Sequence, residues 1–227
     1  MRPIRGFILL GATVPMLSAV SCRAASAAVT IPDPAVDEAR AAAPGHRIAV
    51  LAGGCFWGIQ DVFEHVRGVI SATSGYSGGH VANPTYEMVS DGDTGHAEAV
   101  KIVYDPSQVT FGQLLKVFFS VAHDPTELNR QGPDVGTNYR SAIFYTNPEQ
   151  QRIAQAYIAQ LDKAGVYGKP IVTQVAPFTA FYDAEAYHQD FAQRNPDNAY
   201  IVINDAPKVV NLQRELPGLY TATPAHP

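Results

Sequence analysis

From residue 47 onwards, the hydrophobic positions follow two patterns in turn, one typical of strands and one typical of helices. The pattern predicts strands over residues 47–52, 69–75, 97–104, 141–146 and 171–176. It predicts helices over residues 56–66, 111–121 and 148–163, and a shorter helix near 183–193. Strands interleaved with helices indicate an α/β or α+β fold, with helices packed on one sheet.

Two of the predicted helices begin with capping residues. Thr110 is placed to cap the helix over 111–121, whose apolar side chains share one face because they are three and four positions apart: Phe111, Leu114, Leu115 and Phe118. The segment Asn147-Pro148-Glu149 supplies a cap followed by proline at the first helical position. Both helices are therefore expected to begin at these residues.

Composition along the chain predicts four parts: an export signal over residues 1–27, a linker over 28–45, a globular domain over 46–206 and a tail over 207–227. Arg2 and Arg5 precede an apolar stretch over 6–17, which is too short to span a bilayer comfortably. Alanine and proline are frequent in the linker. The tail is expected either to wrap over the domain or to be disordered.

Two processing sites compete within the predicted export signal. Ala25-Ser26-Ala27 resembles a signal peptidase site, whereas Ala19-Val20-Ser21-Cys22 loosely resembles a lipobox, whose cysteine receives lipid. A third possibility is an uncleaved apolar N-terminus on a cytoplasmic protein. We expect an exported protein, either periplasmic or lipid-anchored at the cell envelope, with membrane attachment only through lipid on Cys22.

Composition limits the kind of partner this protein binds. Of the 227 residues, 46% are hydrophobic and 16% are charged, so the chain can bury a sizeable core. The formal net charge is -5 and no Lys/Arg-rich run is present, which argues against a nucleic-acid partner.

The strongest candidate for chemistry is Cys55, within Gly53-Gly54-Cys55-Phe56-Trp57-Gly58. It lies where a predicted strand gives way to a helix N-terminus, whose free N–H groups and dipole stabilise a thiolate. We therefore expect its pKa to fall below the usual value of about 8.5. The glycines are expected to leave room for a substrate, and Trp57 is the only tryptophan of the chain.

Loops 76–96 and 122–140 are long and rich in polar and aromatic residues, which is typical of functional loops. Glu98 begins an apolar strand beyond the first loop, and burial there would keep its carboxyl protonated, unless the residue is exposed on an edge strand. Asp134 and Tyr139 lie in the second loop, where Asp134 could equally cap its own turn. Tyr86 could be catalytic or a packing residue with an exposed hydroxyl.

His123 and His188 leave a second kind of chemistry open. Either histidine paired with Cys55 would suggest a cysteine hydrolase or acyltransferase. A third alternative is a non-catalytic module that binds oxidised proteins. No histidine cluster, at His80 or at His123-Asp124, has metal-ligand spacing, so no metal site is expected.

Several of these segments together resemble peptide methionine sulfoxide reductase of the A class. They occur in the family's order between about residues 47 and 196: Gly53 to Gly58, Pro84-Thr85-Tyr86, Gly95-His96-Ala97-Glu98, His123-Asp124-Pro125-Thr126, Gln131 to Ser141, and Ala184 to Gln189. The occurrence of all these motifs in register makes the resemblance specific. It implies a two-layer α/β sandwich with a ferredoxin-like core, helices packed on a mixed sheet, and long functional loops.

The resemblance also implies a role for each matching residue in reducing methionine-S-sulfoxide, free or in proteins. Cys55 would be the nucleophile and would become a sulfenic acid, and Glu98 would be the acid. Tyr86, Tyr139 and Asp134 would complete the polar side. Phe56 and Trp57 would form an apolar wall for the substrate's methyl group, and Gly54 and His188 would also lie beside the substrate.

The chain departs from the commoner family pattern because no cysteine follows Cys55. An external thiol is therefore expected to reduce the sulfenic acid, of the thioredoxin, glutaredoxin or glutathione, or dithiothreitol type. No bound cofactor is expected. The partners would be oxidised proteins, methionine sulfoxide and a thiol reductant protein, and we expect a monomer.

Overall fold

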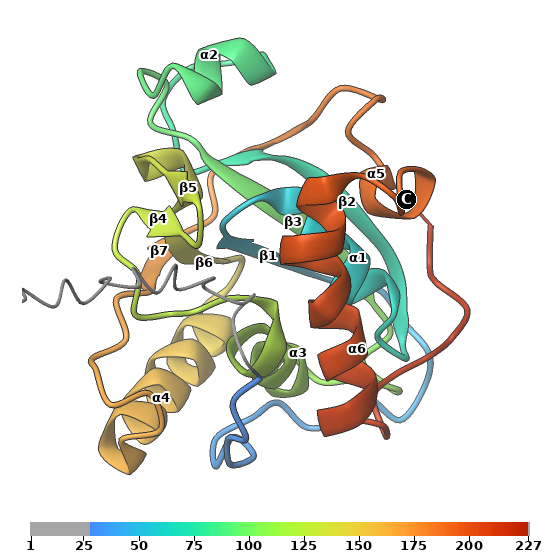
Figure 1. Cartoon of the computed structure of the whole chain (residues 1–227). Helices are drawn as coiled ribbons and strands as arrows, with labels where there is room; N and C mark the ends of the chain where they lie inside the picture. The colour runs from blue at the N-terminus through green and yellow to red at the C-terminus, as the bar shows by residue number, and fades with distance from the viewer. Residues whose placement is uncertain (1–27, 227) are drawn as a thin grey trace, which may run out of the picture.

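A computed structural model describes residues 28–226, so the predicted export signal and Cys22 lie outside the described residues. One mixed sheet forms the middle of the molecule, in the order β7-β6-β1-β3-β2-β8 (Figure 1). Its strands are β1 (Arg47–Gly53), β2 (Val69–Ser77), β3 (Ala97–Tyr104), β6 (Ser141–Tyr145), β7 (Gln174–Pro177) and β8 (Phe181–Asp183). All neighbours pair antiparallel except β6 and β7, which are parallel.

The helices are α1 (Phe56–Glu64), α2 (Tyr86–Ser90), α3 (Phe111–Val117), α4 (Pro148–Ala164), α5 (Phe191–Arg194) and α6 (Ala206–Glu215). Three short turns of other helical types are also present. η1 (Phe118–Ala122) follows α3, η2 (Thr137–Tyr139) precedes β6, and η3 (Ile201–Asp205) precedes α6. A small hairpin joins β4 (Arg130–Gln131) to β5 (Asp134–Val135). Helix α1 packs on the sheet, and α6 packs on α1 (Figure 1).

The core follows from the strand alternation in β1. Ala49 and Leu51 point to the face that carries the large buried aromatic residues, including Phe56 and Phe118. Val50 and Ala52 point to the opposite face, where a smaller cluster contains Phe144. Because β1 is apolar on both sides, it lies inside the sheet, between β6 and β3.

Most of the predicted elements form near the predicted residues, which confirms the α/β sandwich. The predicted helix over 111–121 is divided, because its second half, Phe118–Ala122, adopts a π-helical turn. The helix predicted near 183–193 is reduced to turns followed by α5. The short β8 and α2 were not predicted.

The segment over 28–45, which its composition predicted to be a linker, packs on the domain. Ile31 is buried in the core. Asp37 accepts a hydrogen bond from the Gly112 backbone N–H at 2.8 Å, and Glu38 accepts one from Phe111 N–H at 2.8 Å. Two carboxylates of this segment therefore accept hydrogen bonds from free N–H groups at the start of α3, where the helix dipole favours negative charge.

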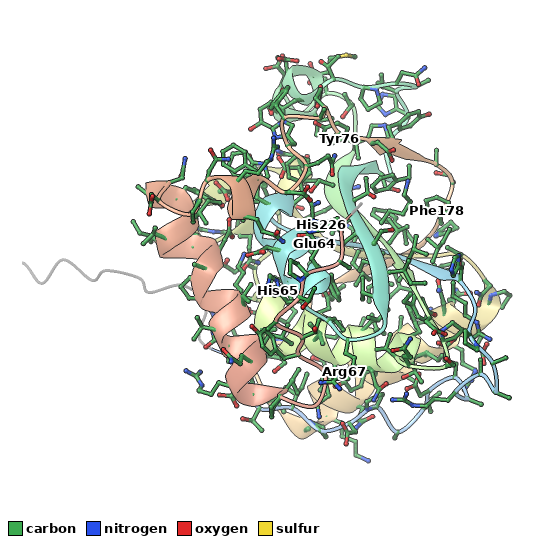
Figure 2. The ribbon with its side chains drawn as sticks, turned by 90° about the vertical axis from the view of Figure 1, so that its right-hand side faces the viewer. Glu64, His65, Arg67, Tyr76, Phe178 and His226 are labelled. Carbon is green, nitrogen blue, oxygen red and sulfur yellow. The ribbon has the colours of Figure 1, made fainter. Side chains whose placement is uncertain are left out.

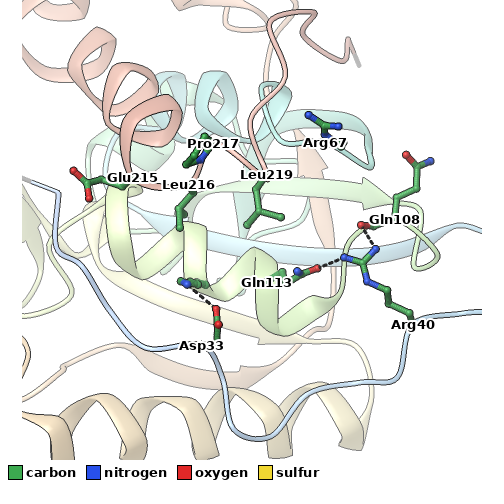
Figure 3. A pocket seen from close by; sticks show the side chains of 11 residues that line it. Asp33, Arg40, Arg67, Gln108, Gln113, Glu215, Leu216, Pro217 and Leu219 are labelled. Carbon is green, nitrogen blue, oxygen red and sulfur yellow. Dashed lines mark hydrogen bonds and ion pairs between the residues drawn. The ribbon is translucent and has the colours of Figure 1, made fainter.

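The same segment encloses a cavity of about 470 Å³ with α3 and residues 215–219 (Figure 3). Its basic side chains are engaged inside it. Lys116 pairs with Asp33 at 2.6 Å, and Arg40 donates to the Gln108 carbonyl at 2.5 Å. One ion pair and one hydrogen bond to a backbone carbonyl therefore tie the 28–45 segment to α3 and to the residues just before it.

Residues 207–226 pack on the domain, which fits the first of the two expectations for this segment, a tail that wraps over the domain, and part of it forms helix α6. Leu212 of α6 is fully buried in the core, and Ala206-Pro207 begins the helix. After α6, the chain runs beside residues 64–67, and the Ala225 N–H donates to the Glu64 carbonyl at 2.8 Å (Figure 2). The folded unit therefore extends past the predicted boundary at both ends.

Among the helices described, none is both long and apolar enough to cross a membrane.

Replacing Glu38 tests whether the 28–45 segment stabilises the domain. Glu38 also accepts from the Tyr104 hydroxyl at 3.0 Å and forms an ion pair with Arg47. Glu38→Ala leaves two buried donors without an acceptor, so we expect a loss of roughly 2–4 kcal/mol in unfolding free energy. Urea unfolding measures it. The exposed Glu149→Ala at the start of α4 is the control, with a loss below about 1 kcal/mol. Equal losses would contradict a stabilising role.

Candidate active site

Cys55 lies between β1 and α1, at the N-cap of the helix, as the sequence predicted. It is 9% exposed. Glu98 of β3 meets the first residue of α1 beside Cys55. The Phe56 backbone N–H donates to Glu98 Oε2 at 3.0 Å, and Glu98 is only 2% exposed. Since β1 pairs with β3 in antiparallel register, with Leu51 opposite Val100, Glu98 is brought level with the end of β1.

Burial decides the protonation of Glu98. Removal of its carboxyl from water raises the pKa to about 8, in spite of the hydrogen bond from Phe56, which lowers it. The negative charges of Asp134 and Asp205 raise it further. Glu98 is therefore a neutral acid at neutral pH, so it has a proton to donate.

The predicted lowering of the Cys55 pKa is wrong. Burial raises the pKa of the thiol well above its usual value, and the carboxyls of Glu98 and Asp205 raise it further. A hydrogen bond from the Trp57 backbone and the charge of Lys208 oppose this shift with smaller effects. The helix N-terminus is present, but the cost of removing a thiolate from water exceeds its stabilisation.

Tyr86, Tyr139 and Asp134 surround the same pair of groups. Burial is the largest cause that raises the pKa of each, and for both tyrosines the charges of Glu98 and Cys55 contribute. Tyr86 begins α2, which is held in place because its backbone N–H donates to Glu185 Oε1 at 2.9 Å. The structure therefore brings together the five residues expected to be catalytic.

The two aromatic residues after Cys55 differ in exposure. Phe56 is fully buried, whereas Trp57 is partly exposed. The indole of Trp57 stacks on Phe191 with ring centres 3.9 Å apart, and Tyr200 meets it edge-on at 6.0 Å. Its Nε1–H donates to His188 Nδ1 at 3.0 Å. Trp57 is therefore fixed from three sides, and Phe56 supports the site from the core.

Neither candidate histidine is hydrogen-bonded to Cys55. His188 accepts from Trp57, so its Nδ1 carries no proton. His123 lies behind the site, where its ring nitrogens contact the Phe118 carbonyl at 3.0 Å and the Ser141 hydroxyl at 2.7 Å. Burial lowers the pKa of His123 to about 4, so it is neutral. This arrangement does not fit a Cys–His hydrolase.

The glycines before Cys55 make room for the protein itself and not for a substrate, which corrects the sequence prediction. A Cβ on Gly54 would lie 2.5 Å from Gln131 Cβ, and Gly54 has φ +97°. A Cβ on Gly53 would lie 2.9 Å from the ring of Phe118. Gly54 therefore allows the loop with Gln131 to close over the start of α1.

Three further residues reach this site from the chain after residue 198, which the sequence reading missed. The Tyr200 hydroxyl donates to Asp134. Asp205 and Lys208 form a buried ion pair at 2.9 Å. The spacing of Val209, Leu212 and Leu216 signals a helix that would have placed them on the domain. Within residues 28–226, no group of three His, Cys, Asp or Glu residues could hold a metal ion.

The fold and the site define a cysteine-dependent enzyme whose thiol lies beside a protonated carboxyl. The family model for peptide methionine sulfoxide reductase matches residues 47–217. Peptide methionine sulfoxide reductase MsrA 2 of Mesorhizobium japonicum is 60% identical over 183 residues, covering 81% of this chain and 94% of that protein. The protein of the same name from a Synechocystis species is 54% identical, covering 82% and 87%.

Two solved structures share the fold. Mxr1 of Saccharomyces cerevisiae in reduced form has a TM-score of 0.61 and 33% identity, covering 67% of this chain and 87% of that chain. Methionine sulfoxide reductase A of Corynebacterium diphtheriae has a TM-score of 0.59 and 38% identity, covering 68% and 77%. The chain belongs to the peptide methionine sulfoxide reductase family.

Adding one methyl group at Gly54 tests how tightly the loop closes. Gly54→Ala combines left-handed backbone strain with a clash against Gln131, so we expect a loss of roughly 2–4 kcal/mol in unfolding free energy. Gly92→Ala is the matched control. Gly92 has φ +88° but open space around its Cβ position, so only about 1 kcal/mol should be lost there. Similar losses in urea unfolding would show that Gln131 moves aside freely.

Proposed function

We propose that this protein reduces methionine-S-sulfoxide, free or in oxidised proteins, to methionine with electrons from an external thiol. The observation that carries the proposal is the placement of Cys55 at the start of α1 next to the neutral carboxyl of Glu98. A sulfoxide needs both a nucleophile for its sulfur and a proton for its oxygen. The family membership and the names of the relatives support the same activity.

The reaction follows from these two groups. The Cys55 thiolate attacks the sulfoxide sulfur while Glu98 donates its proton to the oxygen, which makes the oxygen a better leaving group. The hydroxyl then passes from the substrate sulfur to Cys55 Sγ, so the S–O bond of the substrate and the transient bond between the two sulfurs both break as the S–O bond of the sulfenic acid forms. Methionine leaves as a thioether, reduced by two electrons, and Cys55 becomes a sulfenic acid.

The remaining site residues bind and orient the sulfoxide. Tyr86 and Tyr139 keep their hydroxyl protons because their pKa values are raised, so both can donate hydrogen bonds to the sulfoxide oxygen. Trp57 offers an apolar face to the S-methyl group, a contact worth about 0.3–1.5 kcal/mol. A methyl site opposite a proton donor distinguishes the two sulfoxide epimers, and the accepted epimer is S.

The second half of the cycle requires a thiol from outside the chain. Cys55 is the only cysteine after Cys22. If the chain is processed after Ala27 or lipidated at Cys22, no second thiol remains to form a disulfide. A thioredoxin, a glutaredoxin with glutathione, or dithiothreitol would then reduce the sulfenic acid. The enzyme would act outside the cytoplasm, and the intact mass of the mature chain distinguishes the two processing routes.

The oxidation state of Cys55 after one turnover tests the proposed function. Without reductant, the mature enzyme should release one methionine per chain from a methionine-S-sulfoxide peptide, with a mass loss of about 16 Da. A sulfenic-acid reagent should then label Cys55, and dithiothreitol should restore turnover. Cys55→Ser should be inactive, and the R epimer should persist. Sulfoxide loss in the Ser variant, or turnover of a thioester without reductant, would contradict the proposal.

The pH dependence of a single turnover tests the role of Glu98. In the wild type, the rate should rise with pH as the thiolate forms and then level off above about pH 8, where Glu98 loses its proton. Glu98→Gln should lower the rate at neutral pH by about 10²-fold or more. In this variant the rise should continue through pH 8. Glu149→Gln, an exposed change of the same kind, should keep the wild-type profile. A near-normal rate in Glu98→Gln would assign the proton to another group.

A further inference from the structure

A buried ion pair lies against the first turn of α1, on the side away from the sheet. Asp205, at the end of η3, accepts from Lys208 Nζ of α6 at 2.9 Å. Their side chains are 0% and 8% exposed. The second oxygen of Asp205, Oδ2, has no hydrogen-bond partner among residues 28–226. This pair is therefore almost wholly removed from water, and it is incompletely satisfied.

The contact with α1 passes through Gly58. A Cβ at Gly58 would lie 2.1 Å from Asp205 Oδ1 and 2.9 Å from Lys208 Nζ. Gly58 is the third residue of α1, and Cys55 is the N-cap of the same turn. The lack of a side chain at Gly58 thus lets both charges approach the backbone that carries the nucleophile.

Stability alone does not account for the pair. Two charges lose a large hydration energy on burial, and apolar residues of similar volume often serve a fold equally well. In addition, the oxygen of Asp205 that has no hydrogen-bond partner adds to the free-energy cost of burying the pair. Its position beside the reactive turn suggests an electrostatic role.

The groups that face Cys55 come from several elements. Glu98 of β3 and Asp205 of η3 contribute carboxyls. Tyr86 of α2, Tyr139 of η2 and Tyr200, which precedes η3, contribute hydroxyls. Lys208 acts in the opposite sense, because its positive charge lowers the pKa of Cys55. The carboxyl of Asp205 is itself close enough to affect four other acidic groups: Asp61, Glu98, Asp134 and Tyr200.

We propose that Lys208 is a positioning residue for the nucleophile: held by Asp205 against the first turn of α1, its ammonium stabilises the Cys55 thiolate, and Asp205 limits that stabilisation. The proposal rests on the proposed role of Cys55 as the nucleophile. It assigns a function to the C-terminal helix, which delivers a cation to a site otherwise surrounded by acidic groups.

The reactivity of Cys55 toward iodoacetamide tests the proposal without an assay of sulfoxide reduction. The experiment uses the full chain with Cys22→Ser, so that Cys55 is the only thiol. Lys208→Gln should lower the alkylation rate at about pH 8 by at least about threefold, since half a pKa unit changes the thiolate fraction by that factor. Asp205→Asn should raise it by a similar factor. Lys208→Arg should restore the wild-type rate.

The control is Lys163→Gln, the same change at an exposed position near the end of α4, which should leave the rate unchanged. If the pair had a purely structural role, Lys208→Gln and Asp205→Asn would change the alkylation rate in the same direction, because both variants loosen the same turn. That result, or an unchanged rate in Lys208→Gln, would overturn the proposal. If Asp205→Asn does not fold, the comparison of Lys208→Gln with Lys208→Arg decides.

Failure of the proposed function is distinguishable from failure of this inference. If Cys55 were not the nucleophile, Cys55→Ser would still reduce the sulfoxide, while the alkylation rates would respond to Lys208 as before. If only the inference fails, reduction still depends on Cys55, but alkylation does not respond to the charge at position 208.

Discussion

The hydrogen bond from the Phe56 backbone N–H to Glu98 Oε2 joins the two halves of the active site. It ties the first turn of α1 to β3 and fixes the carboxyl beside the thiol. The bond is made by a side chain near the start of a buried strand, and burial also raises the pKa of Glu98 to about 8. The same burial that creates the acid therefore suppresses the thiolate, and the site must resolve this conflict when substrate binds.

Two effects compete for the charge of Cys55, and their balance explains the resting state. The helix N-terminus and the Trp57 N–H favour the thiolate, whereas burial and two carboxyls oppose it. Desolvation is the larger effect because the thiol is almost completely enclosed. A protonated resting thiol reacts slowly with oxidants, since the thiolate is the reactive species.

The sequence predicted those parts of the molecule that local patterns specify. Cys55 at a strand-to-helix junction and the strand that carries Glu98 both follow from periodicity and flanking residues. The burial of Cys55 depends on packing by segments distant in the sequence and could not be read in the same way, so the pKa of its thiol was predicted in the wrong direction. Elements as short as β8 and α5 contain too few residues to establish a period. The bond between Tyr200 and Asp134 joins residues 66 positions apart, and only the folded chain reveals it.

The C-terminal segment contains no thiol that could attack a sulfenic acid on Cys55. In many members of the family this region carries cysteines that must reach the sulfenic acid. Here Leu212 anchors α6 in the core, and the chain after α6 is hydrogen-bonded along residues 64–67. The segment therefore contributes fixed groups and no thiol. Tyr200 donates a hydrogen bond to Asp134, and the Asp205–Lys208 ion pair packs against α1. Among residues 28–226 Cys55 is the only cysteine, so within the described part of the chain no second thiol can reach its largely enclosed sulfur.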